Sequence, residues 1–320
     1  MIVIHQNILT RFATLLKNDR LAHAYMFIGP AGVGKFETAL QAAKLINCES
    51  GQSEPCEECG SCRKVAGSNH PDIRVLSCTA GETIKIEEIR DLIAQAQLRP
   101  FEAKRKIFII RGAENLTTEA GNALLKTLEE PSATSVILLT TAAPANILGT
   151  IRSRCQPVYF FSVSRAKLAN HLQKDYDIEV ESASFLSAYS EGCLGQARQL
   201  KENDFLKRKN EIIDQMVFAP LNDAYLKKIT ADKEQVREAL FVLLSWFRDV
   251  LLLKQGLSLD GVIHIDRGAE LKKLTASFTN DELNAIIDQI VKTIQLWNDN
   301  LNVKIALILL REHLPFSKIR

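Results

Sequence analysis

The feature that most constrains the fold of this chain is a glycine-rich run placed between an apolar stretch and a helical one. Apolar residues 25–28 precede the run, and residues 37–46 follow it with helix-forming side chains. Strand, glycine-rich loop and helix in this order form a P-loop, whose backbone N–H groups and helix N-terminus surround phosphate. The residues expected to hold a nucleotide are Gly29, Pro30, Ala31, Gly32, Val33, Gly34 and Lys35.

The side chains that would ligate magnesium in such a core are missing from the sequence. A Ser or Thr normally follows the P-loop lysine, but here the residue is Phe36. The apolar strand expected at residues 106–110 should end in acidic residues, and Arg111 and Gly112 stand there instead. Glu114 lies beyond this strand end and is interpreted as a solvated or helix-capping charge. We therefore expect no ATP hydrolysis, while binding of ATP or ADP stays open.

Short apolar runs alternate with amphipathic segments through the first half of the chain. The runs lie at residues 25–28, 73–76, 107–110, 136–140 and 158–161. Strands that alternate with helices are typical of an α/β fold, with a parallel sheet covered on both faces. Beyond residue 163 the apolar residues recur at helical spacing, so this part is expected to be wholly helical.

Four of the seven cysteines, Cys48, Cys56, Cys59 and Cys62, are crowded into one short segment. Short C-x2-C steps let thiolates converge on one ion, and four thiolates make a closed tetrahedral zinc site. Free thiols and an iron–sulfur cluster are the alternatives. The acidic residues around the cluster disfavour contact with phosphate, so a structural or protein-contact role is expected. Cys78, Cys155 and Cys193 are interpreted as small buried residues.

The charge balance and hydropathy exclude several classes of protein. With 40 basic and 38 acidic residues the net charge is +2, well below the excess that dedicated DNA-binding domains carry. No apolar run approaches the ~18 residues of a membrane span. The first residues do not show the pattern of a secretion signal, so a cytoplasmic protein is expected.

Three sequence segments resemble the AAA+ clamp-loader subunits of bacterial DNA polymerase III. They are His-Ala-Tyr-Met-Phe at 23–27, Asn-Ala-Leu-Leu-Lys-Thr-Leu-Glu-Glu-Pro at 122–131 and Ile-Arg-Ser-Arg-Cys at 151–155, with weaker matches at 246–251 and 302–310. The resemblance implies an AAA+ P-loop core at 1–163 that carries the zinc module at 48–62. A helical lid at 164–212 and a helical collar for oligomerisation at 213–320 would follow.

The same resemblance implies a function in a pentameric ring. In this family the gamma and tau subunits hydrolyse ATP, whereas a related stator hydrolyses nothing and presents an arginine to its neighbour. The departures at Phe36, Arg111 and Gly112 favour the stator, and an active gamma- or tau-type ATPase is the alternative. The implied partners are the gamma, tau and delta subunits, with the sliding clamp and primed DNA reached through the complex.

The resemblance also implies roles for individual residues. Arg154 matches the arginine finger that acts in trans, and Arg152 beside it is either functional or a solvated charge. Thr140 and Thr141 match the polar sensor of the γ-phosphate, or satisfy backbone groups. Gly195 stands where the lid would carry a second sensor arginine, and Arg198 nearby has no assigned role.

Overall fold

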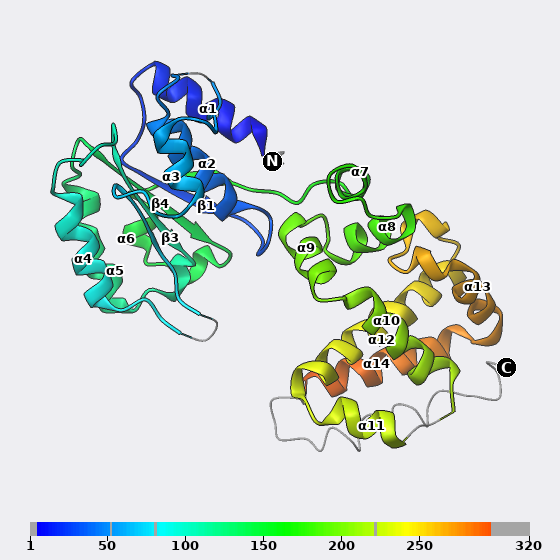
Figure 1. Ribbon diagram of the computed structural model, residues 1–320. Coiled ribbons are helices and arrows are strands. Elements are labelled where there is room, and N and C mark those ends of the chain that lie inside the picture. Colours follow the sequence, from blue (N-terminus) through cyan, green and yellow to red (C-terminus); the bar gives the residue numbers. More distant parts are fainter. Residues whose placement is uncertain (1–4, 52, 80–81, 221–222, 296–320) are drawn as a thin grey trace. The chain divides into compact units, whose positions relative to one another are not determined.

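The computed structural model describes residues 5–51, 53–79, 82–220 and 223–295. Among these residues, the chain forms two compact units (Figure 1). The first contains the residues up to 163 together with 193–195, and the second contains 164–192 and the residues from 196 onward. The further division of the helical part into a lid and a collar stays a prediction.

A five-stranded parallel sheet forms the centre of the first unit. Its strands are β1 (Ala24–Ile28), β2 (Ile73–Leu76), β3 (Lys106–Arg111), β4 (Ser135–Thr141) and β5 (Gln156–Tyr159), in the order β2-β3-β4-β1-β5. The expected α/β class and parallel sheet are therefore confirmed. The last strand lies earlier in the chain than the apolar run at 158–161 predicted, although the N–H of Phe160 still bonds to the carbonyl of Ile28 at 2.7 Å.

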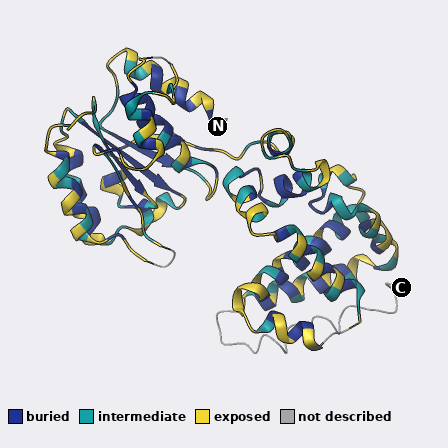
Figure 2. Ribbon diagram, in the orientation of Figure 1, coloured by how far each residue is buried: buried dark blue, intermediate teal, exposed yellow. Residues whose placement is uncertain are grey.

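Helices cover both faces of this sheet because the strands carry apolar side chains on both. Phe27, Ile109 and Leu138 face α1 (Gln6–Lys17) and α2 (Lys35–Asn47). Met26, Phe108 and Ile137 face the opposite layer, made by α4 (Ile86–Ala96), α5 (Thr118–Glu129) and α6 (Gly149–Arg152). Figure 2 shows the strands β1, β3 and β4 buried between the two layers, whereas most residues of the edge strands β2 and β5 are partly or fully exposed. Each large apolar side chain buried here stabilises the fold by about 1.5–3 kcal/mol.

The described part of the second unit is helical. The long helix α12 (Lys233–Lys254) packs on α13 (Gly268–Ser277) and α14 (Asn280–Gln295). Of the apolar stripe on α12, Leu240, Leu243 and Phe247 are buried. The other helices are α7 (Arg165–Tyr176), α8 (Val180–Tyr189), α9 (Leu194–Glu202, which begins in the first unit), α10 (Phe205–Ile213) and α11 (Asp223–Thr230). The weak sequence match at 302–310 lies outside the described residues.

A buried polar cluster lies among the helices of the second unit. His264 is fully buried, and its Nε2 lies 2.9 Å from the hydroxyl oxygen of Ser245. The ammonium of Lys209, also fully buried, pairs with the carboxylate of Asp266 and lies 4.1 Å from the centre of the Phe185 ring. Burial and the nearby positive charges of Lys209, Arg248 and Arg267 hold the pKa of His264 well below its ordinary value.

Within the described residues, no helix is long and apolar enough to cross a membrane.

Candidate functional site

The glycine-rich loop joins β1 to α2, as the sequence predicted for a P-loop. Gly32 and Gly34 have φ values of 72° and 101°, which non-glycine residues rarely adopt. A Cβ on Gly29 would lie 2.5 Å from the carbonyl oxygen of Phe160, so no other residue fits beside β5. The backbone of the loop itself therefore requires glycine at these three positions, whether or not a nucleotide binds.

The ammonium of Lys35 points back into its own loop. Its Nζ donates hydrogen bonds of 2.6 Å to the carbonyl oxygens of Gly29 and Pro30. Burial lowers the pKa of Lys35, and the carboxylate of Glu114 partly counteracts this effect. A bound phosphate would have to draw the lysine away from these two carbonyls.

Two of the three sequence departures from an ATPase, Phe36 and Arg111, lie close together in space. The guanidinium of Arg111, at the end of β3, lies 5.0 Å from the centre of the Phe36 ring. The strand register places Arg111 opposite Thr140 at the same edge of the sheet. A cation–π pair thus occupies the place where P-loop ATPases ligate magnesium through a hydroxyl and a carboxylate.

A small cavity of about 190 Å³ lies between these groups. Known ligand pockets run from about 300 to 1,000 Å³, so this one is small for a whole nucleotide. Its lining includes Gly32, Gly34, Lys35, Phe36, Arg111, Glu114, Thr140 and Thr141. The structure therefore brings together the P-loop and both sensor candidates, and Arg154 is not among the described residues that line the cavity.

The polar groups at the rim of this cavity bond to backbone amides. The hydroxyl oxygens of Thr140 and Thr141 accept hydrogen bonds from the N–H groups of Gly112 (3.3 Å) and Ala143 (3.1 Å). Glu114 accepts a bond from the N–H of Ala142 at 3.0 Å, which joins the turn after β3 to the end of β4. Its sequence position did not reveal this place at the pocket rim, because the contact depends on strand order.

Arg154 lies in the turn between α6 and β5. Its Nη2 is 2.7 Å from a carboxylate oxygen of Glu129 at the end of α5, and its Nη1 donates to the carbonyl of Thr150 at 3.0 Å. The arginine side chain remains 35% exposed, and Arg152 is also exposed. The guanidinium is thus held at the surface of the first unit, outside the cavity of its own chain.

Gly195 makes a close backbone contact with the P-loop. Its N–H donates to the carbonyl of Gly32 at 2.8 Å, and a Cβ on Gly195 would lie 2.8 Å from the same oxygen. A second sensor arginine cannot occupy this position without moving the loop. Arg198 lies 5.6 Å from the ring centre of Tyr176 and pairs with Glu202 at 3.6 Å, within the second unit.

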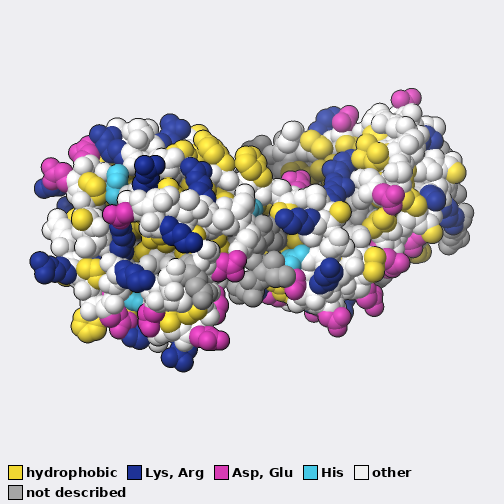
Figure 3. Space-filling model, turned by 90° about the horizontal axis from the view of Figure 1, so that it is seen from above, with side chains coloured by type: hydrophobic (Ala, Val, Ile, Leu, Met, Phe, Trp, Pro, Cys, Tyr) yellow, Lys and Arg dark blue, Asp and Glu magenta, His cyan; other side chains and the backbone are white. Residues whose placement is uncertain are grey.

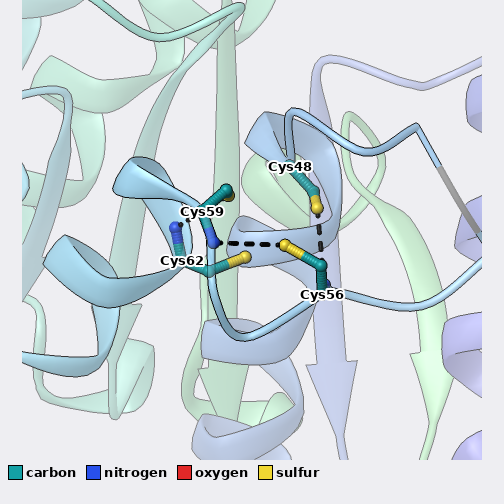
Figure 4. Close-up of side chains that lie close together, drawn as sticks. All are labelled: Cys48, Cys56, Cys59 and Cys62. Carbon is teal, nitrogen blue, oxygen red and sulfur yellow. Dashed lines mark hydrogen bonds between the residues drawn. The ribbon is translucent and has the colours of Figure 1, made fainter.

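The four clustered cysteines converge after α2 (Figure 4). Their Sγ atoms all lie within 4.8 Å of one another. Backbone N–H groups point at the sulfurs: Cys56 to Cys48 at 3.4 Å, Cys59 to Cys56 at 3.3 Å and Cys62 to Cys59 at 3.4 Å. A tetrahedron of thiolates with bonds of about 2.3 Å has edges of about 3.8 Å, so the arrangement fits a structural metal ion.

The other cysteines lie away from this cluster. Cys155 and Cys193 are buried, and burial raises the pKa of the Cys155 thiol to about 12. Cys78 is partly exposed rather than buried.

Comparison with known proteins gives consistent matches over both units. Residues 4–164 match the model of the family described as DNA polymerase III, delta subunit, and residues 203–314 match that of its C-terminal part. The chain is 30% identical to the DNA polymerase III subunit delta' of Bacillus subtilis, over 90% of this chain and 89% of that protein. It is 31% identical to subunit delta' of Haemophilus influenzae, over 78% and 76%. It is also 29% identical to subunit tau of Bacillus subtilis, over 92% of this chain and 57% of that one.

Proposed function

The chain belongs to the delta-prime family of bacterial DNA polymerase III subunits and is a clamp-loader component, and we propose that it acts there as a non-hydrolysing stator. The observation that carries this proposal is the Phe36–Arg111 pair. A phenyl ring cannot ligate magnesium, and the guanidinium repels it. The gamma- or tau-type ATPase is disfavoured for the same reason.

Arg154 is the residue proposed to act on the reaction. A planar guanidinium placed against the γ-phosphate of a neighbouring subunit stabilises the charge of the transferring phosphoryl group. The exposed position of Arg154 supports this role. Exposed ion pairs such as Arg154–Glu129 contribute about 0–1 kcal/mol, so the arginine can exchange Glu129 for a phosphate at little cost.

The remaining assignments follow from family membership. The chain forms a complex with other clamp-loader subunits, and we propose that gamma or tau and delta complete the ring in the cytoplasm. The sliding clamp and primed DNA would be reached through that complex. On the face drawn in Figure 3, side chains of both charge signs are scattered, which favours indirect contact with DNA. Cys48, Cys56, Cys59 and Cys62 are proposed to bind one structural zinc ion.

The test is Arg154→Ala in a loader reconstituted with gamma or tau and delta. Single-turnover hydrolysis at the site facing Arg154 should fall by roughly 10³- to 10⁵-fold, since that is the usual contribution of an arginine finger. Arg90→Ala, at an exposed arginine on α4, is the matched control and should leave the rate within about threefold. Ring assembly, followed by size-exclusion chromatography, should not change because only a surface ion pair is lost. Unchanged hydrolysis in an assembled ring would refute the finger role.

A further inference from the structure

The ion pair between Glu129 and Arg154 joins two segments whose backbones are anchored in the core. Leu128, directly before Glu129, is 2% exposed, and Cys155, directly after Arg154, is 5% exposed. Both of these buried residues belong to the core on the side of the sheet that α4, α5 and α6 cover. The backbone therefore fixes where the two charged residues stand, and what remains free is the torsions of their own side chains.

Close packing of α5 against α6 brings these two segments together. A Cβ on Gly121 of α5 would lie 3.0 Å from Cδ1 of Leu148 and 3.5 Å from Cδ1 of Ile151. Ile151 is 1% exposed and lies on α6, just before the turn that carries Arg154. The turn after α6 therefore places Arg154 beside the end of α5.

Glu129 occupies an unfavourable position on its helix. It is the last residue of α5, and Glu130 follows it as the C-cap. The aligned peptide dipoles make this end of a helix negative, so a carboxylate here is destabilising. Arg154 offsets that cost for Glu129 at 2.7 Å, whereas Glu130 has no ion pair among the residues that the structure describes. Helix stability alone does not favour an acid at position 129, which points to a role toward the arginine.

The guanidinium of Arg154 is held through two of its three nitrogens. Nη1 donates to the carbonyl oxygen of Thr150 at 3.0 Å and to the hydroxyl oxygen of Ser153 at 3.4 Å, while Nη2 pairs with Glu129. Nε has no hydrogen-bond partner in the described parts of the chain. The Nε–H group is thus available to an anion while the other two nitrogens stay in place.

We propose that Glu129 is a positioning residue that orients the guanidinium of Arg154 before the ATP of the neighbouring subunit meets it. The inference rests on the proposed finger role of Arg154. Ordering one rotamer-rich side chain at an interface lowers an affinity or a rate by roughly three- to tenfold. Because Glu129 imposes this order within the folded chain, the cost is not added to the barrier of hydrolysis.

The opposite role is that Glu129 competes with the phosphate for the same guanidinium. The ion pair is exposed on both sides, and such pairs are weak, so Glu129 does not hold Arg154 back from a more strongly charged anion. The two roles predict opposite effects of removing the carboxylate: a loss of positioning slows hydrolysis, whereas a loss of competition speeds it.

The first experiment measures single-turnover hydrolysis in a loader reconstituted from this chain, gamma or tau, and delta. Glu129→Gln should lower the rate at the site facing Arg154 by roughly three- to tenfold, with ring assembly unchanged. Glu130→Gln removes the same charge from the same helix end and is the matched control, with the rate of the wild-type chain expected. A rate for Glu129→Gln that equals or exceeds that of the wild-type chain would overturn the proposal.

A double variant separates positioning from a general structural effect. In the Arg154→Ala background there is no guanidinium to orient, so Glu129→Gln should have no further effect on the rate. An additional loss of the same size there would show that Glu129 acts independently of Arg154, and the positioning role would be wrong. If Arg154→Ala itself leaves hydrolysis unchanged, the finger role and the positioning role fail together. A large effect of Arg154→Ala without any effect of Glu129→Gln removes the positioning role alone.

The second experiment measures the order of the arginine side chain in the isolated full-length chain, without the ring. Nitrogen-15 relaxation of the Arg154 Nε–H group reports motion on the ps–ns timescale. Its order parameter should fall in Glu129→Gln and keep the wild-type value in Glu130→Gln. An order parameter that Glu129→Gln leaves unchanged would show that Glu129 does not orient the guanidinium, whatever the hydrolysis rates are.

Discussion

The Phe36–Arg111 pair predicts that magnesium does not strengthen nucleotide binding to this pocket. It also predicts that restoring both residue types creates a metal site. Phe36→Ser returns the missing hydroxyl, and Arg111→Asp returns the carboxylate and removes the positive charge. Neither change is expected to suffice alone, because each leaves the other obstacle in place.

The size of the effect follows from the geometry. The guanidinium lies 5.0 Å from the centre of the ring that replaces the metal-ligating side chain. At an effective dielectric constant of about 20, a dication about 5 Å from a unit positive charge is destabilised by roughly 7 kcal/mol, or about five orders of magnitude in affinity. Arg111 is exposed, so screening reduces this repulsion, and we expect about two to three orders of magnitude. The lost cation–π contact should reduce stability by about 0.5–1 kcal/mol.

Titration of a fluorescent ATP analogue, in magnesium or in EDTA, measures the effect. The wild-type chain and both single variants should bind with an affinity that magnesium does not raise, whereas the double variant should bind at least ~100-fold more tightly with magnesium. Arg152→Asp, with the same charge change at another exposed site, should behave as the wild type. Tighter binding of the analogue to the wild-type chain in magnesium, or a folded double variant whose affinity magnesium does not change, would refute this prediction.

Two further predictions concern the metal and the pH response. Metal analysis should find about one zinc per chain, and chelation should lower Tm by several degrees. Cys59→Ser should abolish binding and Cys78→Ser should not, while a zinc-free chain with unchanged Tm would contradict the assignment. Burial lowers the pKa of His264 in the folded protein. As the pH falls below about 6.5, His264 is therefore protonated in the unfolded chain before it is protonated in the folded one. Stability should therefore decrease below that pH in thermal unfolding, and an equally steep decrease in His264→Gln would show that other groups cause it.

Several parts of the fold were predictable because they depend on neighbours in sequence. The strand, loop and helix around the P-loop follow from glycines at set intervals, and the cysteine cluster follows from two short C-x2-C steps. The central strands β1, β3 and β4 were predicted because runs of apolar residues are typical of strands buried on both faces, and the edge strands β2 and β5 were predicted from shorter apolar runs although they are partly exposed. The predicted run at 158–161 extends past β5, because Phe160 after the strand is buried in the same core, whereas Phe161 is exposed.

Other features could not be read from the sequence because they join distant segments. The backbone amides of residues 101–103 donate to the carboxylate of Asp72, which lies far from them along the chain, and nothing in the composition of this loop predicts that three of its amides point at one side chain. Likewise, Glu129 belongs to a segment that matches the family, but its pairing with Arg154 depends on how α5 packs beside α6.

By itself, the sequence determined that this P-loop lacks a magnesium ligand at Phe36 and an acidic residue at Arg111, since the chemistry of a residue is known from its identity. Only the tertiary structure decided that these two residues contact each other. β3 pairs in parallel with β4, and the P-loop joins β1 to α2. Arg111 at the end of β3 and Phe36 at the start of α2 therefore lie at the same edge of the sheet. There the guanidinium of Arg111 lies over the ring of Phe36, so the two residues that stand in place of magnesium ligands also contact each other.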